Sequence, residues 1–143
     1  MAEELTLRVI TPERMVVDTA ASSVQIPAID GSMGIFPKHA AMVAALDSGM
    51  MTYTAAGQTH SVFVAGGFAD VRDNTLRILT PAGEPPEKID EERARKAEAR
   101  ARERLKPQRS NMTAEEAAID IVRANAALHR AIMRLKVSQR GRR

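Results

Sequence analysis

The sequence predicts an α+β protein in which an N-terminal β-sandwich is followed by an antiparallel hairpin of two helices. Residues 1–84 contain short apolar stretches about ten residues apart with turn residues between them, which is typical of a sandwich or flattened barrel. Residues 85–143 contain two amphipathic stretches joined by a polar loop. All three phenylalanines and the single tyrosine lie before residue 81. We therefore expect the main core in the first part of the chain.

Charge divides the chain at the same place. Residues 1–80 carry five basic and eight acidic side chains, whereas residues 81–143 carry sixteen and ten. The absence of cysteine excludes disulfides and thiolate metal sites. No apolar run approaches the ~20 residues that cross a bilayer, and glutamates stand where a signal peptide would be basic. We expect a soluble, unprocessed protein that meets membranes only through another protein.

The strands follow from the alternation of apolar and polar residues. Residues 5–10 alternate and end at Thr11-Pro12, and the turn signals Ala56-Gly57 and Asp73-Asn74 separate later strands. Residues 40–46 fit either a strand or a short helical turn. The remaining expected strands are residues 14–19, 22–28, 50–54, 59–65, 68–72 and 76–80.

Two glycine pairs mark special positions in this sandwich. Gly31 and Gly34 precede an apolar pair that Pro37 closes, which predicts a tight turn and a short strand at an edge or corner. Gly66 and Gly67 interrupt a strand pattern, which predicts a bulge or a close approach of another backbone.

Two helices are expected at about 90–105 and 114–137. Asp90 begins the first, followed by two glutamates that suit its N-terminal dipole, and Lys106-Pro107 ends it before the polar loop 108–112. Thr113 and Glu116 form a capping box that begins the second.

The two helices carry apolar stripes of unequal size. Alanine buries little surface and each buried CH₂ contributes only ~0.8 kcal/mol, so this hairpin should be marginally stable alone and able to undock. The expected stripes are Ala94, Ala97, Ala101 and Leu105 on the first helix, and Ala118, Ile121, Leu128, Ile132 and Leu135 on the second.

Three motifs in order carry a resemblance that covers nearly the whole chain. They are Asp30-Gly-x-x-Gly-Ile-Phe-Pro-x-His-Ala40, Ala65-Gly-Gly-Phe-Ala-Asp-Val71 and Ile89-Asp-Glu-Glu-Arg-Ala94, followed by a basic hairpin. This combination resembles the epsilon subunit of a bacterial F-type ATP synthase. The resemblance implies a sandwich of about ten strands docked on the gamma subunit and the c-ring. It also implies helices that fold or extend along gamma, contacting the alpha and beta subunits.

The implied role is that of a non-catalytic central-stalk subunit. It couples the rotor to the c-ring in proton-driven ATP synthesis and inhibits ATP hydrolysis when the helices extend. The implied location is the cytoplasmic face of the bacterial inner membrane, as a peripheral part of the complex.

The third motif resembles the ATP-binding signature of bacterial epsilon subunits, in which arginines of both helices converge on the phosphates. Charge-assisted hydrogen bonds to phosphate replace the mutual repulsion of these arginines. Asp90 can accept from the adenine amino group, and Ile89 and Ala94 can cover the ring. The chain has no P-loop lysine motif, so the implied role of ATP is that of a regulatory ligand that the protein senses. ATP would not be hydrolysed, and no cofactor is required. The implied site is Glu84, Ile89, Asp90, Arg93, Ala94, Arg100, Arg130 and Arg134.

The resemblance also implies docking residues. Many relatives have an acidic residue after the first glycine of the docking turn, and this chain has Ser32. In the extended state the basic second helix meets an acidic loop of the beta subunit. The implied docking residues are Gly31, Ser32, Gly34 and His39 in the turn, and Arg123, Lys136 and Arg140 on the second helix.

Two other functions fit the sequence less well than this resemblance. The basic tail favours nucleic-acid binding, but it lacks aromatic residues for base stacking and carries ten carboxylates. An enzyme is disfavoured because His39, His60 and His129 lie in unrelated contexts, without metal-ligand spacing or a nucleophile motif. We interpret His39 as partner-facing or structurally bonded, and His129 as part of the polar face of its helix.

Overall fold

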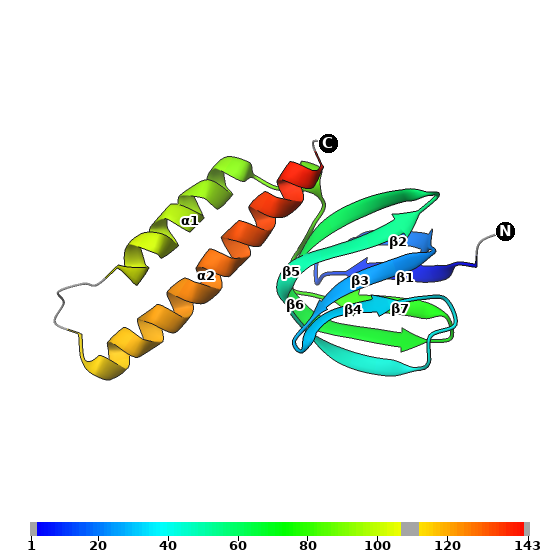
Figure 1. Ribbon diagram of the computed structural model, residues 1–143, viewed down its shortest axis with the longest axis horizontal. Helices are drawn as coiled ribbons and strands as arrows, with labels where there is room; N and C mark the ends of the chain where they lie inside the picture. Colours follow the sequence, from blue (N-terminus) through cyan, green and yellow to red (C-terminus); the bar gives the residue numbers. More distant parts are fainter. Residues whose placement is uncertain (1–2, 107–111, 142–143) are drawn as a thin grey trace.

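The computed structural model describes residues 3–106 and 112–141. A β-domain forms one body, and two antiparallel helices project from it (Figure 1). The strands are β1 Leu5–Ile10, β2 Met15–Ala21, β3 Ser23–Ala28, β4 Gly31–Ile35, β5 Met42–Ala55, β6 Gln58–Arg72, β7 Thr75–Leu79 and β8 Gly83–Glu84. They are followed by the 3₁₀ turn η1 Pro86–Lys88 and the helices α1 Glu91–Leu105 and α2 Ala114–Arg140.

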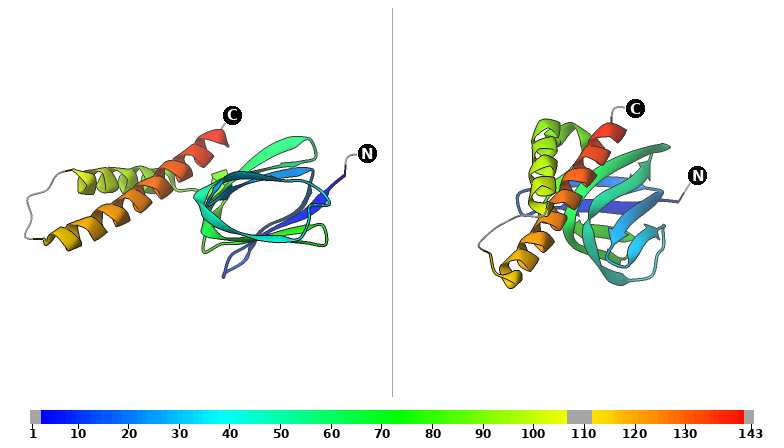
Figure 2. Two further views of the ribbon diagram at one scale, coloured as in Figure 1. Left: turned by 60° about the horizontal axis from the view of Figure 1, so that its bottom comes forward. Right: turned by 60° about the vertical axis from the view of Figure 1, so that its left-hand side comes forward.

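The sheet wraps around one apolar core. Its strand order is β2-β1-β7-β6-β5-β3-β4, with β8 paired to β6. All pairs are antiparallel except β1 with β7. The two layers enclose the interior (Figure 2, left). The alternation predicted for the first strand is confirmed, since Leu5, Leu7 and Val9 are buried.

The two longest strands each contribute to both layers. The register of β5 against β6 is continuous from the Met42–Val71 pair to the Ala55–Gln58 pair. Each long strand therefore joins two stretches that were expected to be separate. Strand β5 joins 40–46, from Met42 onward, to 50–54, and β6 joins 59–65 to 68–72. The open interpretation of residues 40–46 is resolved in favour of a strand, beginning at Met42. The described chain has eight continuous strands, and the expected ten are reached only if each half of β5 and β6 is counted.

Gly66 and Gly67 allow β6 to bend without a register shift. Both have positive φ, at 84° and 105°. A Cβ on Gly67 would collide with the backbone carbonyl of Leu79 on the neighbouring strand. The predicted close approach is thus confirmed, and the interruption of the strand pattern reflects a backbone contact and not a bulge.

The expected turns and edge are present. Ala56-Gly57 and Asp73-Asn74 all have positive φ and join β5 to β6 and β6 to β7. The strand that Pro37 closes is β4, which lies at the end of the sheet order. Short β8 was not predicted, because it lies in the proline-rich connector.

Both helices begin with side-chain caps. Asp90 accepts from the backbone N–H of Arg93 at 3.0 Å, and Thr113 and Glu116 form the reciprocal capping box. In α1, three ion pairs link a glutamate to a base four residues later, which is the favourable orientation. These pairs are Glu91–Arg95, Glu92–Lys96 and Glu98–Arg102. Among the described helices none is long and apolar enough to cross a membrane.

The stripe predicted for α1 is confirmed, but that for α2 is partly wrong. Ala118 and Ile121 are exposed, while Ala124, Ala131 and Ser138 are buried. These three residues are spaced by seven, like buried Ala94 and Ala101 on α1. Small residues on both helices permit close packing. The contact between α1 and α2 therefore follows the alanines and not the larger apolar residues.

We expect Gly67→Ala to destabilise the sandwich by about 2–4 kcal/mol, because the new Cβ meets a backbone carbonyl at a positive φ. Urea unfolding followed by Tyr53 fluorescence measures this. Gly57→Ala is the matched control, since its φ is also positive but nothing lies within 4 Å of the added atom. We expect a loss of about 1 kcal/mol for this control. Equal losses for the two variants would contradict the steric explanation.

Candidate functional site

One arginine of α2 connects the helices to the sandwich. The Arg134 Nε lies 3.3 and 3.2 Å from the two Glu84 carboxylate oxygens, and its Nη2 lies 3.1 Å from Oε2. Its guanidinium also stacks over Phe63, with 4.4 Å between Cζ and the ring centroid. Phe63 and Glu84 are direct cross-strand neighbours on β6 and β8. Strand pairing therefore presents a ring and a carboxylate together to one cation.

Further contacts lie on both sides of Arg134 along α2. The His129 Nε2 lies 2.6 Å from the Ser48 carbonyl oxygen of β5, which corrects the interpretation of His129 as merely part of a polar face. Val137 is fully buried, and Gly141 packs so closely on Pro86 that an added Cβ would collide with its ring. The sequence could not reveal these contacts, because they join residues far apart in the chain.

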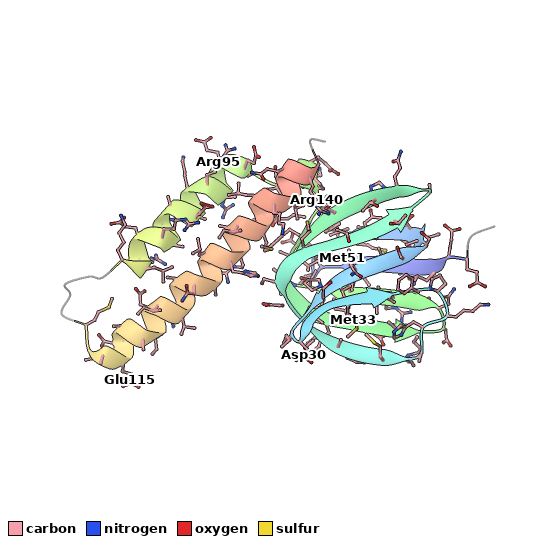
Figure 3. All side chains as sticks on the ribbon, viewed as in Figure 1. Asp30, Met33, Met51, Arg95, Glu115 and Arg140 are labelled. Atoms are coloured by element: carbon pink, nitrogen blue, oxygen red, sulfur yellow. The ribbon has the colours of Figure 1, made fainter. Side chains whose placement is uncertain are left out.

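Among the described residues, the main contacts between the helical hairpin and the sandwich are made by α2. Helix α2 packs on β5, β6 and η1, whereas α1 packs on α2 and makes no comparable contact with another described element. The far end of the hairpin points away from the sheet (Figure 1 and Figure 2, left). The labelled Glu115 lies at that far end and Arg140 beside the sandwich (Figure 3).

A cationic cavity of about 410 Å³ lies where η1, α1 and α2 meet. Six of the eight residues in the expected nucleotide site line it together: Glu84, Asp90, Arg93, Ala94, Arg100 and Arg134. Lys88 and Ala97 complete the lining and were not expected. Lys88 lies one residue before the signature motif, so motif matching could not assign it.

The charges of this cationic cavity are unevenly compensated. Glu84 pairs with Arg134, and one Asp90 oxygen caps α1. Within residues 3–106 and 112–141, the side chains of Lys88, Arg93 and Arg100 form no ion pair. Among the described residues these three cations therefore line the cavity without an ion-pair partner, which suits an anionic ligand.

Two residues of the expected nucleotide site lie elsewhere. Ile89 lines a separate cavity with Pro86, Glu87 and Ser138. Arg130 is half-buried on α2 and does not line the cationic cavity. Arg130 lies four residues before Arg134, so the two share one side of the helix.

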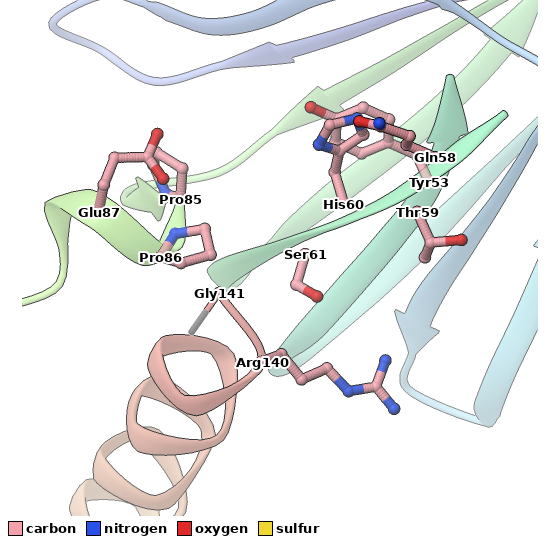
Figure 4. Close-up of a pocket in the computed structure, with 10 residues that line it drawn as sticks. All are labelled: Tyr53, Gln58, Thr59, His60, Ser61, Pro85, Pro86, Glu87, Arg140 and Gly141. Atoms are coloured by element: carbon pink, nitrogen blue, oxygen red, sulfur yellow. The ribbon is translucent and has the colours of Figure 1, made fainter. Parts of the chain in front are cut away.

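Arg140 lies in a further cavity of about 380 Å³ between the β5–β6 turn, η1 and the end of α2 (Figure 4). Tyr53 and His60, direct cross-strand neighbours, stack there with ring centroids 5.0 Å apart. Burial raises the pKa of Tyr53 above its ordinary value, and the charge of Glu87 raises it further. The phenol therefore stays neutral. Within the described ranges no three acidic or histidine side chains gather as a possible metal site.

The residues of the expected docking turn are spread along β4. Gly31 and Ser32 are exposed at its start, and Gly34 is half-buried within it. His39 follows the other end of the strand, where its Nδ1 lies 2.8 Å from the Ala40 carbonyl oxygen. Exposed Ile29 and Phe36 flank β4 on either side, at 64% and 60% exposure. The edge strand thus presents polar backbone between two apolar side chains.

A second exposed surface lies on the outer face of the sheet. Phe68 pairs directly with Leu79, and Val43 lies two residues from the Ala45 that pairs with Phe68. These three side chains are 56%, 45% and 71% exposed. Arg123 and Lys136 are exposed on α2, with no ion pair in the described part of the chain.

Comparison with known proteins assigns this fold and sequence to a family. Residues 4–86 match the β-sandwich domain of the ATP synthase delta/epsilon chain, and residues 87–139 match its long α-helix domain. The chain belongs to the ATP synthase delta/epsilon family. The expected fold, a sandwich followed by two helices, is confirmed, and the assignment makes the chain an epsilon-type component of the central stalk.

Bacterial relatives of this family match the chain over nearly its full length. The ATP synthase epsilon chain of Nitratidesulfovibrio vulgaris is 39% identical over 96% of this chain and 97% of its own length. That of Symbiobacterium thermophilum is 43% identical, covering 94% and 93%. A chain in the cryo-EM structure of the Euglena gracilis mitochondrial ATP synthase, with OSCP, F1 and c-ring, has a TM-score of 0.76 at 22% identity. This match covers 95% of this chain and 81% of the other, and it shows the shared fold.

We expect Glu84 and Arg134 to be energetically coupled by about 1–2 kcal/mol, because each side chain is less than a third exposed and the pair shares several hydrogen bonds. A double-mutant cycle of Glu84→Gln and Arg134→Met tests this. The measurement is hydrogen-exchange protection at the C-terminal end of α2. Additive effects of the two substitutions would show that the pair does not hold the helix to the sandwich.

Proposed function

We propose that the chain is a non-catalytic regulatory subunit of the ATP synthase central stalk. Residues 1–84 dock on the gamma subunit and the c-ring and couple the rotor to proton-driven ATP synthesis. The hairpin of residues 85–143 inhibits ATP hydrolysis when it leaves the sandwich. The bacterial relatives support a peripheral position on the cytoplasmic face of the inner membrane.

The observation that carries this proposal is the limited attachment of the hairpin. Among the described elements, α2 makes the main helical contacts with the sandwich, through β5 and β6, and α1 packs chiefly on α2. Isolated polar contacts and a narrow buried stripe give a docked state of low local stability. A partner or ligand that binds one state more tightly can then shift the equilibrium between the docked hairpin and the extended hairpin.

Docking on the stalk is supported by exposed apolar side chains on the rigid sandwich. The surface of Val43, Phe68 and Leu79 supports one interface, and the β4 edge with Gly31, Ser32, Gly34 and His39 supports the other. In the extended state, exposed Arg123 and Lys136, together with Arg140, meet acidic groups of the beta subunit.

ATP sensing is supported by the cationic cavity, which α1 and α2 line together. A ligand that binds only the docked state stabilises it by RT ln(1 + [L]/Kd), about 2.7 kcal/mol at a hundredfold excess over Kd. ATP therefore relieves inhibition. Nucleic-acid binding has no comparable support, because this cavity has no aromatic lining for base stacking.

We expect Gly141→Ala to strengthen inhibition of ATP hydrolysis, because the added methyl group collides with Pro86 and disfavours docking without changing a charge. ATPase assays on the reconstituted complex measure this. If the packing of α2 on the sandwich is weakened by ~1 kcal/mol, residual ATPase activity should fall by about threefold or more. Gln139→Ala, at an exposed position of the same helix end, is the control. Unchanged or weaker inhibition for Gly141→Ala would contradict the proposal.

We expect Arg93→Gln to reduce ATP affinity about tenfold or more, because it removes a charge-assisted contact in the cavity. Isothermal titration on the full chain measures the affinity. Arg95→Gln is matched in chemistry, but Arg95 pairs with Glu91 and does not line the cationic cavity, so it should bind ATP normally. Equal loss in both variants would indicate a general effect of charge.

A further inference from the structure

The β6–β7 turn is connected to the segment that follows the β4 edge through one side chain, that of Asn74. We propose that Asn74 is a positioning residue for docking on the stalk. It fixes the conformation of residues 36–39 and, through them, the presentation of Phe36 beside the β4 edge. This inference deepens the proposed function, because it rests on the β4 edge being a docking surface.

Asn74 joins three segments of the chain. Its Oδ1 accepts from the backbone N–H of Lys38 at 2.8 Å, and its Nδ2 donates to the Glu4 carbonyl oxygen at 2.9 Å. Its own carbonyl oxygen accepts from the backbone N–H of Thr6 at 3.0 Å. The two side-chain bonds fix the orientation of the amide, because its oxygen meets a donor and its nitrogen an acceptor. The segment after β4 and the start of β1 are therefore both tied to one residue of the β6–β7 turn.

The turn gives Asn74 a fixed position. Asp73 and Asn74 have φ of 52° and 57°, in the left-handed region that a two-residue hairpin turn requires. Strand pairing continues up to this turn, since Arg72 pairs directly with Thr75. The backbone on both sides of Asn74 is therefore restrained by the sheet, and its side chain extends from a rigid element.

The segment bound by Asn74 has a conformation that its own residues do not favour. Lys38 has a φ of 64°, in the left-handed region that costs free energy for a residue with a side chain. Such a conformation persists only where surrounding contacts fix it. Here the contacts are the hydrogen bond to Asn74 and an ion pair between the Lys38 Nζ and the Glu3 Oε1, 2.9 Å apart. Because both side chains of the ion pair are exposed, the hydrogen bond to Asn74 is the more specific restraint.

Phe36 lies where this restraint acts. The backbone N–H of His39 donates to the Phe36 carbonyl oxygen at 3.2 Å, which closes the turn after β4. Phe36, His39 and Asn74 line one small crevice together. The Phe36 ring also lies against Gly34, because a Cβ added to Gly34 would come within 3.2 Å of the Phe36 Cε2. A ring that is 60% exposed is thus held in one place beside the β4 edge, which lowers the entropic cost of docking.

The test measures binding of the labelled full chain to an ATP synthase complex depleted of this subunit. Asn74→Gly removes both side-chain hydrogen bonds but keeps the turn, because glycine adopts a positive φ readily. We expect this variant to raise the Kd about tenfold. Solvent exchange of the Lys38 backbone N–H, measured by NMR on the free chain, should accelerate by about tenfold as well.

Two further variants separate positioning from a general effect on the turn. Asn74→Asp tolerates the same φ and keeps an oxygen for the Lys38 N–H, and the charge of this acceptor offsets the lost bond to Glu4. We expect both readouts to return to within about threefold of the unsubstituted chain. Asp73→Gly makes the glycine substitution at the other position of the turn. Asp73 does not line the crevice with Phe36, so this variant should leave both readouts unchanged.

Phe36→Ala distinguishes failure of this inference from failure of the proposed docking. If Phe36→Ala weakens binding and Asn74→Gly does not, the inference is overturned and docking through the β4 edge stands. If neither variant weakens binding, both are overturned. Weaker binding of Asn74→Gly without faster exchange at Lys38 would overturn the inference, because Asn74 would then contact the partner directly. Equal losses in Asn74→Gly and either Asn74→Asp or Asp73→Gly would overturn it as well.

Discussion

The guanidinium of Arg134, held between the Glu84 carboxylate and the Phe63 ring, fixes how the two halves of the molecule meet. The two-residue strand β8 has its importance here, because its pairing with β6 places Glu84 opposite Phe63. The same arginine lines the cationic cavity. One side chain thus belongs both to the contact that docks α2 and to the site proposed to sense a ligand, so occupancy of the cavity and docking are physically linked.

The helices α1 and α2 are stabilised by contacts within each helix as well as by the packing between them. Helix α1 has a side-chain cap and three favourably oriented ion pairs, and α2 has a capping box. Each such feature contributes a few tenths to about 1 kcal/mol without needing another domain. The tertiary contacts are alanine-rich and narrow by comparison. The caps and ion pairs therefore favour helical structure in α1 and α2 independently of their packing on each other, which the proposed movement of the hairpin requires.

The sequence predicted those features that depend on local chemistry. Asp90 and Thr113 begin their helices as expected, and Gly66-Gly67 marks a backbone contact, because caps and positive φ angles are short-range requirements. The prediction of the buried residues of α2 was partly wrong. Periodicity identifies apolar positions, but it does not show which face of the helix contacts another helix and which contacts a sheet. The contact of His129 with Ser48 and the stacking of Arg134 on Phe63 join residues tens of positions apart. No pattern in a single sequence specifies such pairs.

The placement of the docking contacts at one end of α2 determines how a pull on the hairpin is resisted. From His129 to Gly141 the attached part of the helix is about 18 Å long, and the unattached part from Ala114 to His129 is about 22 Å. A load at the outer end acts first on the His129 contact and only then on Arg134 and Val137. The bonds are strained in succession, like a strip peeled from one edge, and peeling requires far less force than shearing all of them at once. A load that lifts the outer end of the hairpin therefore removes α2 with less force than a load along the helix axis, which strains all of these contacts at once.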